Sequence, residues 1–323
     1  MIRRTLVRAL VVSALVALVL PVAGAAEKYP SRSIQWIVGW GAGGGTDVFT
    51  RGLVKGVQDR LGVAIAVQNM PGASSATAMD YVMNQPADGY TVFSITSDIL
   101  QNAVLKRGAY TFRDLTLLVR AHVDVGLIQA GPASPFKSWA ELVAQAKANP
   151  GKQTWAGTGA GSSDEINSVM IADAAGIQIK YVPFEGASEM HAALLGGHVQ
   201  AMYEEPGPVI ALIEAGRTKP LLVLADKRLE RFPNVPSAKE HGYAVPPFLW
   251  RGVAVKKGTP PEIVTTLLKA IEGAMKTPEY QQFEEKRLLN LYPGFMVGEE
   301  FARNTEREYS VYADIMKRLG LVK

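Results

Sequence analysis

Short apolar runs alternate with helical patterns along most of the chain, and this alternation limits the fold more than any other feature. Residues 34–40 have the pattern of a buried strand, and residues 46–61 have helical periodicity. Such pairs recur as far as residue 225, and about nine or ten strands are predicted, more than one sheet usually holds. Strand–helix alternation is typical of α/β folds. We therefore predict two domains, each a mostly parallel sheet flanked by helices.

Two long apolar stretches are suited to connect these domains. Residues 116–129 would carry the chain out near residue 125, and the strand expected at residues 248–255 would bring it back near residue 247. The prediction is that residues 26–124 and 247–323 form domain 1 and that residues 125–246 form domain 2.

The N-terminus has the pattern of a secretory signal. Three arginines in the first eight residues precede an apolar run at residues 9–20, and a stretch of small residues follows. We predict a signal peptide over residues 1–25, cleaved after Ala25, and a mature chain in the periplasm. The alternative is a membrane anchor, but the uncharged stretch is marginal in length for a span and Pro21 interrupts it.

Composition and charge exclude several classes of protein. The chain has no cysteine, which rules out disulfides, Cys-ligated metals and cysteine nucleophiles. Arg3, Arg4 and Arg8 are three of 34 Lys and Arg residues, so the rest of the chain has 31 against 30 Asp and Glu. A nucleic-acid partner is therefore not expected, because such a protein should present a basic face.

A glycine-rich loop follows the first strand. Residues 39–44 fit G-x-G-x-x-G, but the second strand ends in Gln68, where a dinucleotide site needs an acidic residue. No cofactor is predicted. The N–H groups and dipole at the start of the following helix instead favour an anion, which glycines allow to approach closely. Thr46 is the expected N-cap. The candidate ligand-binding residues here are Trp40, Gly41, Ala42, Gly43, Gly44, Thr46 and Asp47.

A second glycine-rich loop has the same position in the second predicted domain. It also follows a strand and opens a helix, and Ser162 and Glu165 have the spacing of a capping box. Two such helix ends, facing across a cleft, suit a ligand with two or more carboxylates, or with one carboxylate and an opposing polar end. The alternative is that both loops are only tight turns. The candidate residues here are Gly159, Ala160, Gly161, Ser162 and Ser163.

No catalytic or metal-binding set is found. The four histidines lack metal-ligand spacing, His191 is expected to be solvated, and a nucleophile elbow is absent. Adjacent carboxylates such as Glu204 and Glu205 are usually surface charge. Arg251, expected at the end of a strand, suits either a ligand carboxylate or a structural salt bridge. We predict that the chain is not an enzyme.

Several segments, in this order and spacing, resemble the substrate-binding proteins of tripartite tricarboxylate transporters, the Bug receptors. The resemblance runs over nearly all of the predicted mature chain. The segments include 43–47 (GGGTD), 69–73 (NMPGA), 88–91 (DGYT), 159–163 (GAGSS), 182–186 (VPFEG), 194–199 (LLGGHV), 232–236 (FPNVP), 250–252 (WRG) and 258–261 (GTPP).

This resemblance implies a type II periplasmic binding protein fold that closes on a carboxylate held between the domains by the two loops. It also implies that residues 96–98 line the cleft and that the ligand passes to a two-subunit membrane permease. Ser97, Glu204 and Arg251 complete the set of candidate ligand-binding residues. A monomer is expected.

The chain departs from the family pattern at three places. Ser74 and Ser75 stand where glycines are common, Asp164 and Glu165 where a histidine and a leucine are common, and Glu185 where a lysine is common. These departures bear on the ligand rather than on the fold. Trp40 and Trp250 form either an aromatic wall or ordinary core, so an aromatic carboxylate is as suitable as a citrate-like acid.

We therefore predict a periplasmic receptor that captures a small organic carboxylate for uptake. Two other functions use the same sequence features. One is a receptor that presents its closed form to a membrane signalling partner. The other is a secreted hydrolase or lyase, which would require a catalytic set that the sequence does not show.

Overall fold

The computed structural model describes residues 28–245 and 249–322, and residues 32–323 form one compact unit. The predicted signal peptide at residues 1–25 and its cleavage site lie outside the described residues. The strands are β1 (Ile34–Val38), β2 (Ile65–Asn69), β3 (Thr91–Thr96), β4 (Leu115–Asp124), β5 (Leu127–Ala130), β6 (Gln153–Thr158), β7 (Ile179–Phe184), β8 (Ala201–Glu204), β9 (Lys219–Val223), β10 (Leu249–Lys256) and β11 (Met296–Val297). The helices are α2 (Gly45–Leu61), α3 (Ala76–Met83), α4 (Asp98–Val104), α5 (Trp139–Ala148), α6 (Ser163–Ala174), α7 (Ala187–Leu195), α8 (Pro206–Glu214), α9 (Pro261–Met275), α10 (Pro278–Arg287) and α11 (Gly298–Arg318).

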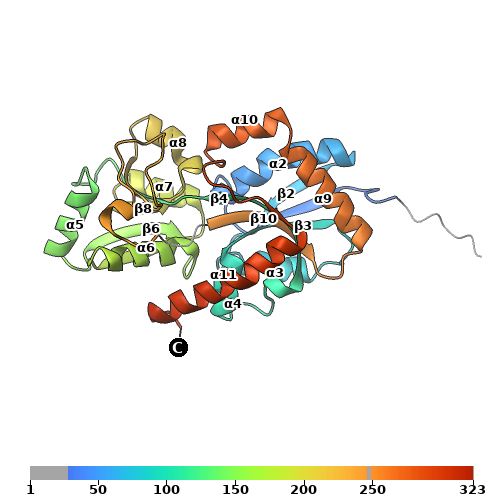
Figure 1. The fold of residues 1–323 in the computed structure, drawn as a ribbon, viewed down its shortest axis with the longest axis horizontal. Coiled ribbons are helices and arrows are strands. Elements are labelled where there is room, and N and C mark those ends of the chain that lie inside the picture. The colour runs from blue at the N-terminus through green and yellow to red at the C-terminus, as the bar shows by residue number, and fades with distance from the viewer. Residues whose placement is uncertain (1–27, 246–248, 323) are drawn as a thin grey trace, which may run out of the picture. The chain divides into compact units, whose positions relative to one another are not determined.

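The strands form two sheets, as predicted (Figure 1). The first has the order β11-β4-β10-β3-β1-β2, and the second has the order β7-β6-β8-β5-β9. Strands β1, β2 and β3 are parallel, as are β6, β7 and β8. Strands β4, β5 and β10 pair antiparallel with their neighbours. The sheets are therefore mixed rather than mostly parallel, because apolar patterning marks a strand without giving its direction.

The segments that connect the two sheets lie where the sequence indicated. Strand β4 ends in the first sheet at Asp124, and β5 begins in the second sheet at Leu127. Strand β10 returns to the first sheet and pairs with β4 from Leu249 onward. The predicted return point at residue 247 lies outside the described residues, and the exact domain boundaries stay a prediction.

Local signals explain where several helices begin and end. Helix α2 stops at Gly62, whose φ of 71° is left-handed and whose N–H donates to the Gln58 carbonyl, as the glycine stop predicts. Ser138 caps α5 by accepting from the Glu141 N–H. Helix α4, which follows β3, was not anticipated; it is only seven residues long, too short for a clear helical period.

Large aromatic side chains fill the core of each sheet. Trp250 is 1% exposed, packs edge-to-face on Phe301 with ring centroids 5.1 Å apart, and donates its indole N–H to Glu308. It is therefore core rather than cleft wall. Trp139 and Trp155 make the corresponding edge-to-face pair, at 6.0 Å, beside the second sheet.

Figure 1 shows α5, α6, α7 and α8 grouped around the second sheet, and α2, α9 and α10 around the first. In residues 28–245 and 249–322, no helix combines the length and the apolar character needed to cross a bilayer.

A substitution in β10 tests how tightly the first sheet is packed. A Cβ at Gly252 would lie 2.6 Å from the Val119 carbonyl oxygen and 3.1 Å from the ring of Phe301. We expect Gly252→Ala to lower the free energy of unfolding by about 1–3 kcal/mol, because backbone and core ring must shift. The matched control is Gly273→Ala, where the contacting atoms belong to the exposed side chain of Arg60. That variant should be neutral or gain up to about 1 kcal/mol of helix stability. Urea unfolding measures both, and equal effects would contradict the packing argument.

Candidate functional site

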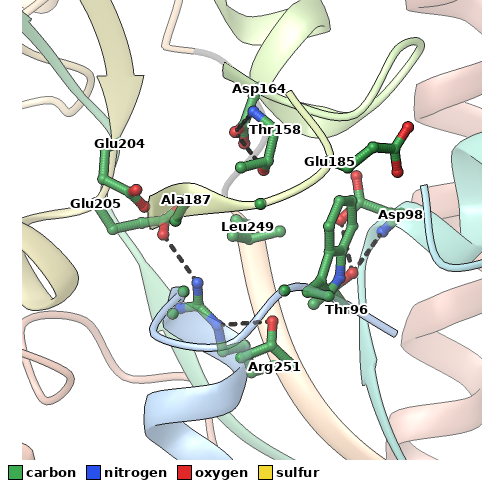
Figure 2. A pocket seen from close by; sticks show the side chains of 16 residues that line it. Thr96, Asp98, Thr158, Asp164, Glu185, Ala187, Glu204, Glu205, Leu249 and Arg251 are labelled. Carbon is green, nitrogen blue, oxygen red and sulfur yellow. Dashed lines mark hydrogen bonds and ion pairs between the residues drawn. The ribbon is translucent and has the colours of Figure 1, made fainter. Parts of the chain in front are cut away.

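The carboxyl ends of parallel strands from both sheets meet at one cavity (Figure 2). Strand β3 runs into Thr96 and Asp98, β6 ends at Thr158 and β8 ends at Glu204. Ligands of open α/β sheets bind at this position. The lining residues are Trp40, Gly41, Gly44, Gly45, Thr46, Thr96, Asp98, Thr158, Asp164, Glu185, Gly186, Ala187, Glu204, Glu205, Leu249 and Arg251. The cavity volume of about 30 Å³ holds roughly two water molecules. A di- or tricarboxylate therefore enters only if the two sides of the cleft move apart.

The first glycine loop faces this cavity. Four of its candidates, Trp40, Gly41, Gly44 and Thr46, line it. Gly44 is the N-cap of α2, in place of the predicted Thr46, and it provides no side-chain cap. Within the described part of the chain the start of α2 has no side-chain cap, and the N–H groups of a helix's first turn have no intrahelical partner, so they can bind an anion in the cavity.

The remaining candidates of the first loop shape it from outside the cavity. Asp47 is buried and accepts hydrogen bonds from the Gly43 N–H (3.0 Å), the Arg51 guanidinium (2.9 Å) and the Asn69 amide (3.0 Å). The carbonyl of Ala42 accepts from the Ser188 hydroxyl at 3.2 Å, a contact with the α7 side of the cleft. Ala42, Gly43 and Asp47 do not line the cavity.

None of the five candidates of the second glycine loop lines the cavity. Ser162 caps α6 by accepting from the Glu165 N–H, as predicted, but carboxylates of the chain itself occupy the neighbouring amides. Glu165 accepts from the Gly161 N–H at 2.6 Å, and Asp98 accepts from the Ser163 N–H at 2.7 Å. The anion position at the start of α6 is thus filled by the carboxylate of Asp98, which the sequence pattern could not show.

Direct hydrogen bonds across the cleft hold its two sides together at this point. The hydroxyl of Ser163 lies 3.1 Å from that of Ser97 and accepts from the Gln101 amide at 2.8 Å. The hydroxyl of Ser74 donates to the Ala160 carbonyl at 2.9 Å. Ser97, a candidate ligand-binding residue, is fully buried in this contact and does not reach the cavity.

Arg251 is a structural ion-pair residue at the floor of the cavity. Its guanidinium binds Asp124 on β4 and Glu205 after β8, the latter at 2.8 Å, and its Nε donates to the Thr46 hydroxyl at 3.4 Å. Burial disfavours the charged form of Asp124, but attraction to Arg251 and to His122 outweighs burial and lowers the pKa of that carboxyl. Arg251 lies near the start of β10, not at a strand end as predicted. It forms structural salt bridges and also lines the cavity, so its role toward a ligand stays a prediction.

Three further carboxyl groups are buried with Glu205 around the cavity. Burial raises the pKa of Asp164 well above its usual range, and the charge of Glu204 raises it further. Burial also raises the pKa of Glu205 well above its usual range, against the attraction of Arg251, and it raises that of Asp98. The inner surface of the site is therefore rich in carboxyl groups, and burial favours the protonated form of Asp98, Asp164 and Glu205.

Sequence reasoning placed some of these residues wrongly. Glu204 and Glu205 are 5% and 2% exposed, so this pair is not surface charge. His191 is half-buried rather than solvated, and its ring nitrogen lies 2.9 Å from a Glu204 oxygen. The signal that could have identified Glu205 is its position directly after the buried strand β8, and Asp98 lies two residues after the end of β3. Among the described residues, no three His, Asp or Glu side chains are arranged to hold a metal ion.

The buried ion pairs predict a large effect of removing the arginine alone. Arg251→Met should lower the free energy of unfolding by about 3–5 kcal/mol, because Asp124 and Glu205 stay buried without a cation. The triple variant that also carries Asp124→Asn and Glu205→Gln should recover most of this loss. The matched control is Arg113→Met. The exposed ion pair of Arg113 with Glu306 should contribute only about 0–1 kcal/mol to the free energy of unfolding. Guanidinium unfolding measures all three, and a triple variant no more stable than the single one would contradict this account.

The raised pKa of Asp164 predicts a pH-dependent stability. A carboxyl group whose pKa is raised in the folded state lowers the free energy of unfolding when it is ionised. This loss is complete above the raised pKa and disappears as pH falls toward the ordinary pKa of 3.8. The groups acting on Asp164 are Glu204 and Asp98, which raise its pKa, and Thr158, whose hydrogen bonds lower it. We expect Asp164→Asn to melt above the parent at pH 8 and to lose this advantage by about pH 4.5. Melting curves of the two proteins without added ligand give the difference, and a constant or reversed difference would refute the prediction.

Comparisons with known proteins agree with this architecture. The model of the tripartite tricarboxylate transporter family receptor, TctC, matches residues 49–321. A UPF0065 protein in the gbd 5' region of Cupriavidus necator is 31% identical over 306 residues, covering 94% of this chain and 92% of that protein. Protein BugT of Bordetella pertussis is 34% identical over 259 residues, covering 78% of this chain and 79% of that protein.

Solved structures show the same fold. The periplasmic binding protein BugD has a TM-score of 0.83 at 25% identity and covers 90% of this chain and 99% of its own. Rpa4515 of R. palustris, solved with adipate, has a TM-score of 0.84 at 25% identity and covers 90% of this chain and 98% of its own. The two-sheet architecture is thus the two-domain α/β fold of periplasmic binding proteins. The chain belongs to the tripartite tricarboxylate transporter receptor family, as a Bug-type substrate-binding protein.

Proposed function

We propose that this receptor works in the periplasm, as a monomer without catalytic activity, and captures a small organic carboxylate in the cavity between its two sheets. It then delivers the solute to a two-subunit membrane permease. The observation that carries the proposal is the uncapped N-terminus of α2, whose N–H groups can hold a carboxylate at the cavity wall. The relative solved with adipate supports a carboxylate as the ligand.

Capture in this proposal requires opening and closing of the cleft. The cavity is too small for a dicarboxylate, and the contacts of Ser163 and Ala160 across the cleft must break for entry. A ligand that touches both sides stabilises the closed form, because it contacts both sides at once only there. The connecting strands β4 and β10 are the positions where the backbone can bend.

A thermal-shift experiment tests the carboxylate class. The panel is citrate, succinate, adipate, terephthalate and nicotinate, with glucose and ribose as neutral solutes. A ligand at about a hundred times its dissociation constant adds about 2.7 kcal/mol, which at this chain length raises the melting midpoint by at least about 2 °C. A shift given by carboxylates alone is expected. A shift given by sugars alone would overturn the proposal.

A variant at the cleft shows whether binding occurs there. A Cβ at Gly41 would lie 2.9 Å from the Cα of Gly186 on the opposite side, so Gly41→Val should hinder closure and abolish the shift. The control is Ala148→Val, on the exposed end of α5, which also introduces a valine and should keep the shift. Deletion of the gene should remove uptake of the radiolabelled ligand; unchanged uptake would favour the signalling alternative.

A further inference from the structure

The described inner wall of the cavity carries four buried carboxyl groups against one cation. Asp98, Asp164, Glu204 and Glu205 line it and are 3%, 7%, 5% and 2% exposed. Among the described lining residues the one cation is Arg251, and its guanidinium already binds two carboxylates. A solute that brings two or three negative charges would meet no unpaired cation among these described lining residues, and each ionised carboxylate of the wall would repel it.

Three carboxyl oxygens on this wall have no hydrogen-bond donor within the described part of the chain. They are Oδ1 of Asp164, Oε1 of Glu204 and Oε1 of Glu205; the second oxygens bind Thr158, His191 and Arg251 respectively. Figure 2 shows Glu204 and Glu205 side by side, with Asp164 above them and Arg251 below. An ionised carboxylate only accepts hydrogen bonds, and a nearby cation favours that ionised form, so a cationic donor such as an ammonium group suits these oxygens.

The opposite chemistry lies at the start of α2. Gly45 and Thr46 line the cavity, and their N–H groups belong to the uncapped first turn. The Thr46 hydroxyl contacts Arg251, which places this helix end on the Arg251 side of the cavity, away from Asp164. One side of the cavity thus donates hydrogen bonds, and the other side accepts them.

Resting on the proposed function, we propose that the ligand is a small zwitterion rather than a plain di- or tricarboxylate. Its single carboxylate binds the N–H groups at the start of α2. Its protonated amine binds Glu204 and Asp164, to which it offers three N–H donors and a compensating charge. Glu185, at the exposed mouth of the cavity, attracts the same charge during entry.

Matched pairs of solutes test the inference at pH 7.5. Each pair compares a diacid with the amino acid in which an ammonium replaces one carboxylate: succinate with 4-aminobutyrate, glutarate with 5-aminopentanoate, and adipate with 6-aminohexanoate. Isothermal calorimetry measures the affinities. For at least one pair we expect the amino acid to bind about tenfold more tightly or better, the effect of one charged hydrogen bond.

Two variants locate the effect. Glu204→Gln and Asp164→Asn should each reduce the preference within the best pair to less than about threefold, because one charged acceptor is lost. Glu214→Gln removes a carboxylate on the exposed surface of α8 and should leave the preference unchanged.

The outcomes separate this inference from the proposed function. If the diacids bind as tightly as the amino acids, or more tightly, the inference is overturned and the proposed function stands. If hexylamine binds as tightly as 6-aminohexanoate, the amine site stands and the carboxylate part of the proposed function fails. If neither series binds while citrate, terephthalate or nicotinate shifts the melting midpoint, the inference is overturned and the proposed function stands.

Discussion

The two sheets are joined through the ion pairs of Arg251. This side chain extends from β10 and binds Asp124 at the end of β4 and Glu205 just after β8, so that one guanidinium connects both crossing strands of the first sheet to the second sheet. All three groups are buried, and each would be costly without the others. The floor of the cavity and the start of α2, which Arg251 also contacts, take their positions from this cluster.

Much of the fold could be predicted because its signals are local. The alternation of strands and helices, the glycine stop of α2 and the serine caps of α5 and α6 each depend on a few neighbouring residues. The directions of β4, β5 and β10 could not be predicted, because apolar patterning is the same for parallel and antiparallel strands. Helix α4 is too short to show a period.

The candidate site was only partly predictable, because its decisive contacts join residues far apart in the sequence. Both glycine loops have the composition of an anion site, yet only the first faces the cavity. The two loops differ because of Asp98, which lies 65 residues before Ser163 in the sequence. The Asp98 carboxylate accepts a hydrogen bond from the Ser163 N–H in the second loop. Likewise, Glu204 and Glu205 are adjacent acids in the sequence, and only the return of β10 with Arg251 shows that they are buried.

The bond between Asp98 and the start of α6 also bears on how tightly any solute is held. Asp98 belongs to the same chain, so its carboxylate is present at this helix end at a high effective concentration. A free solute that competes for the same N–H groups loses translational and rotational entropy when it binds. A solute that uses this position has to displace a tethered acid. The binding free energy of such a solute is then the difference between two closed forms, one with Asp98 and one with the solute at the start of α6. A mutation that weakens the hydrogen bond of Asp98 therefore changes the affinity although the mutated residue does not contact the solute.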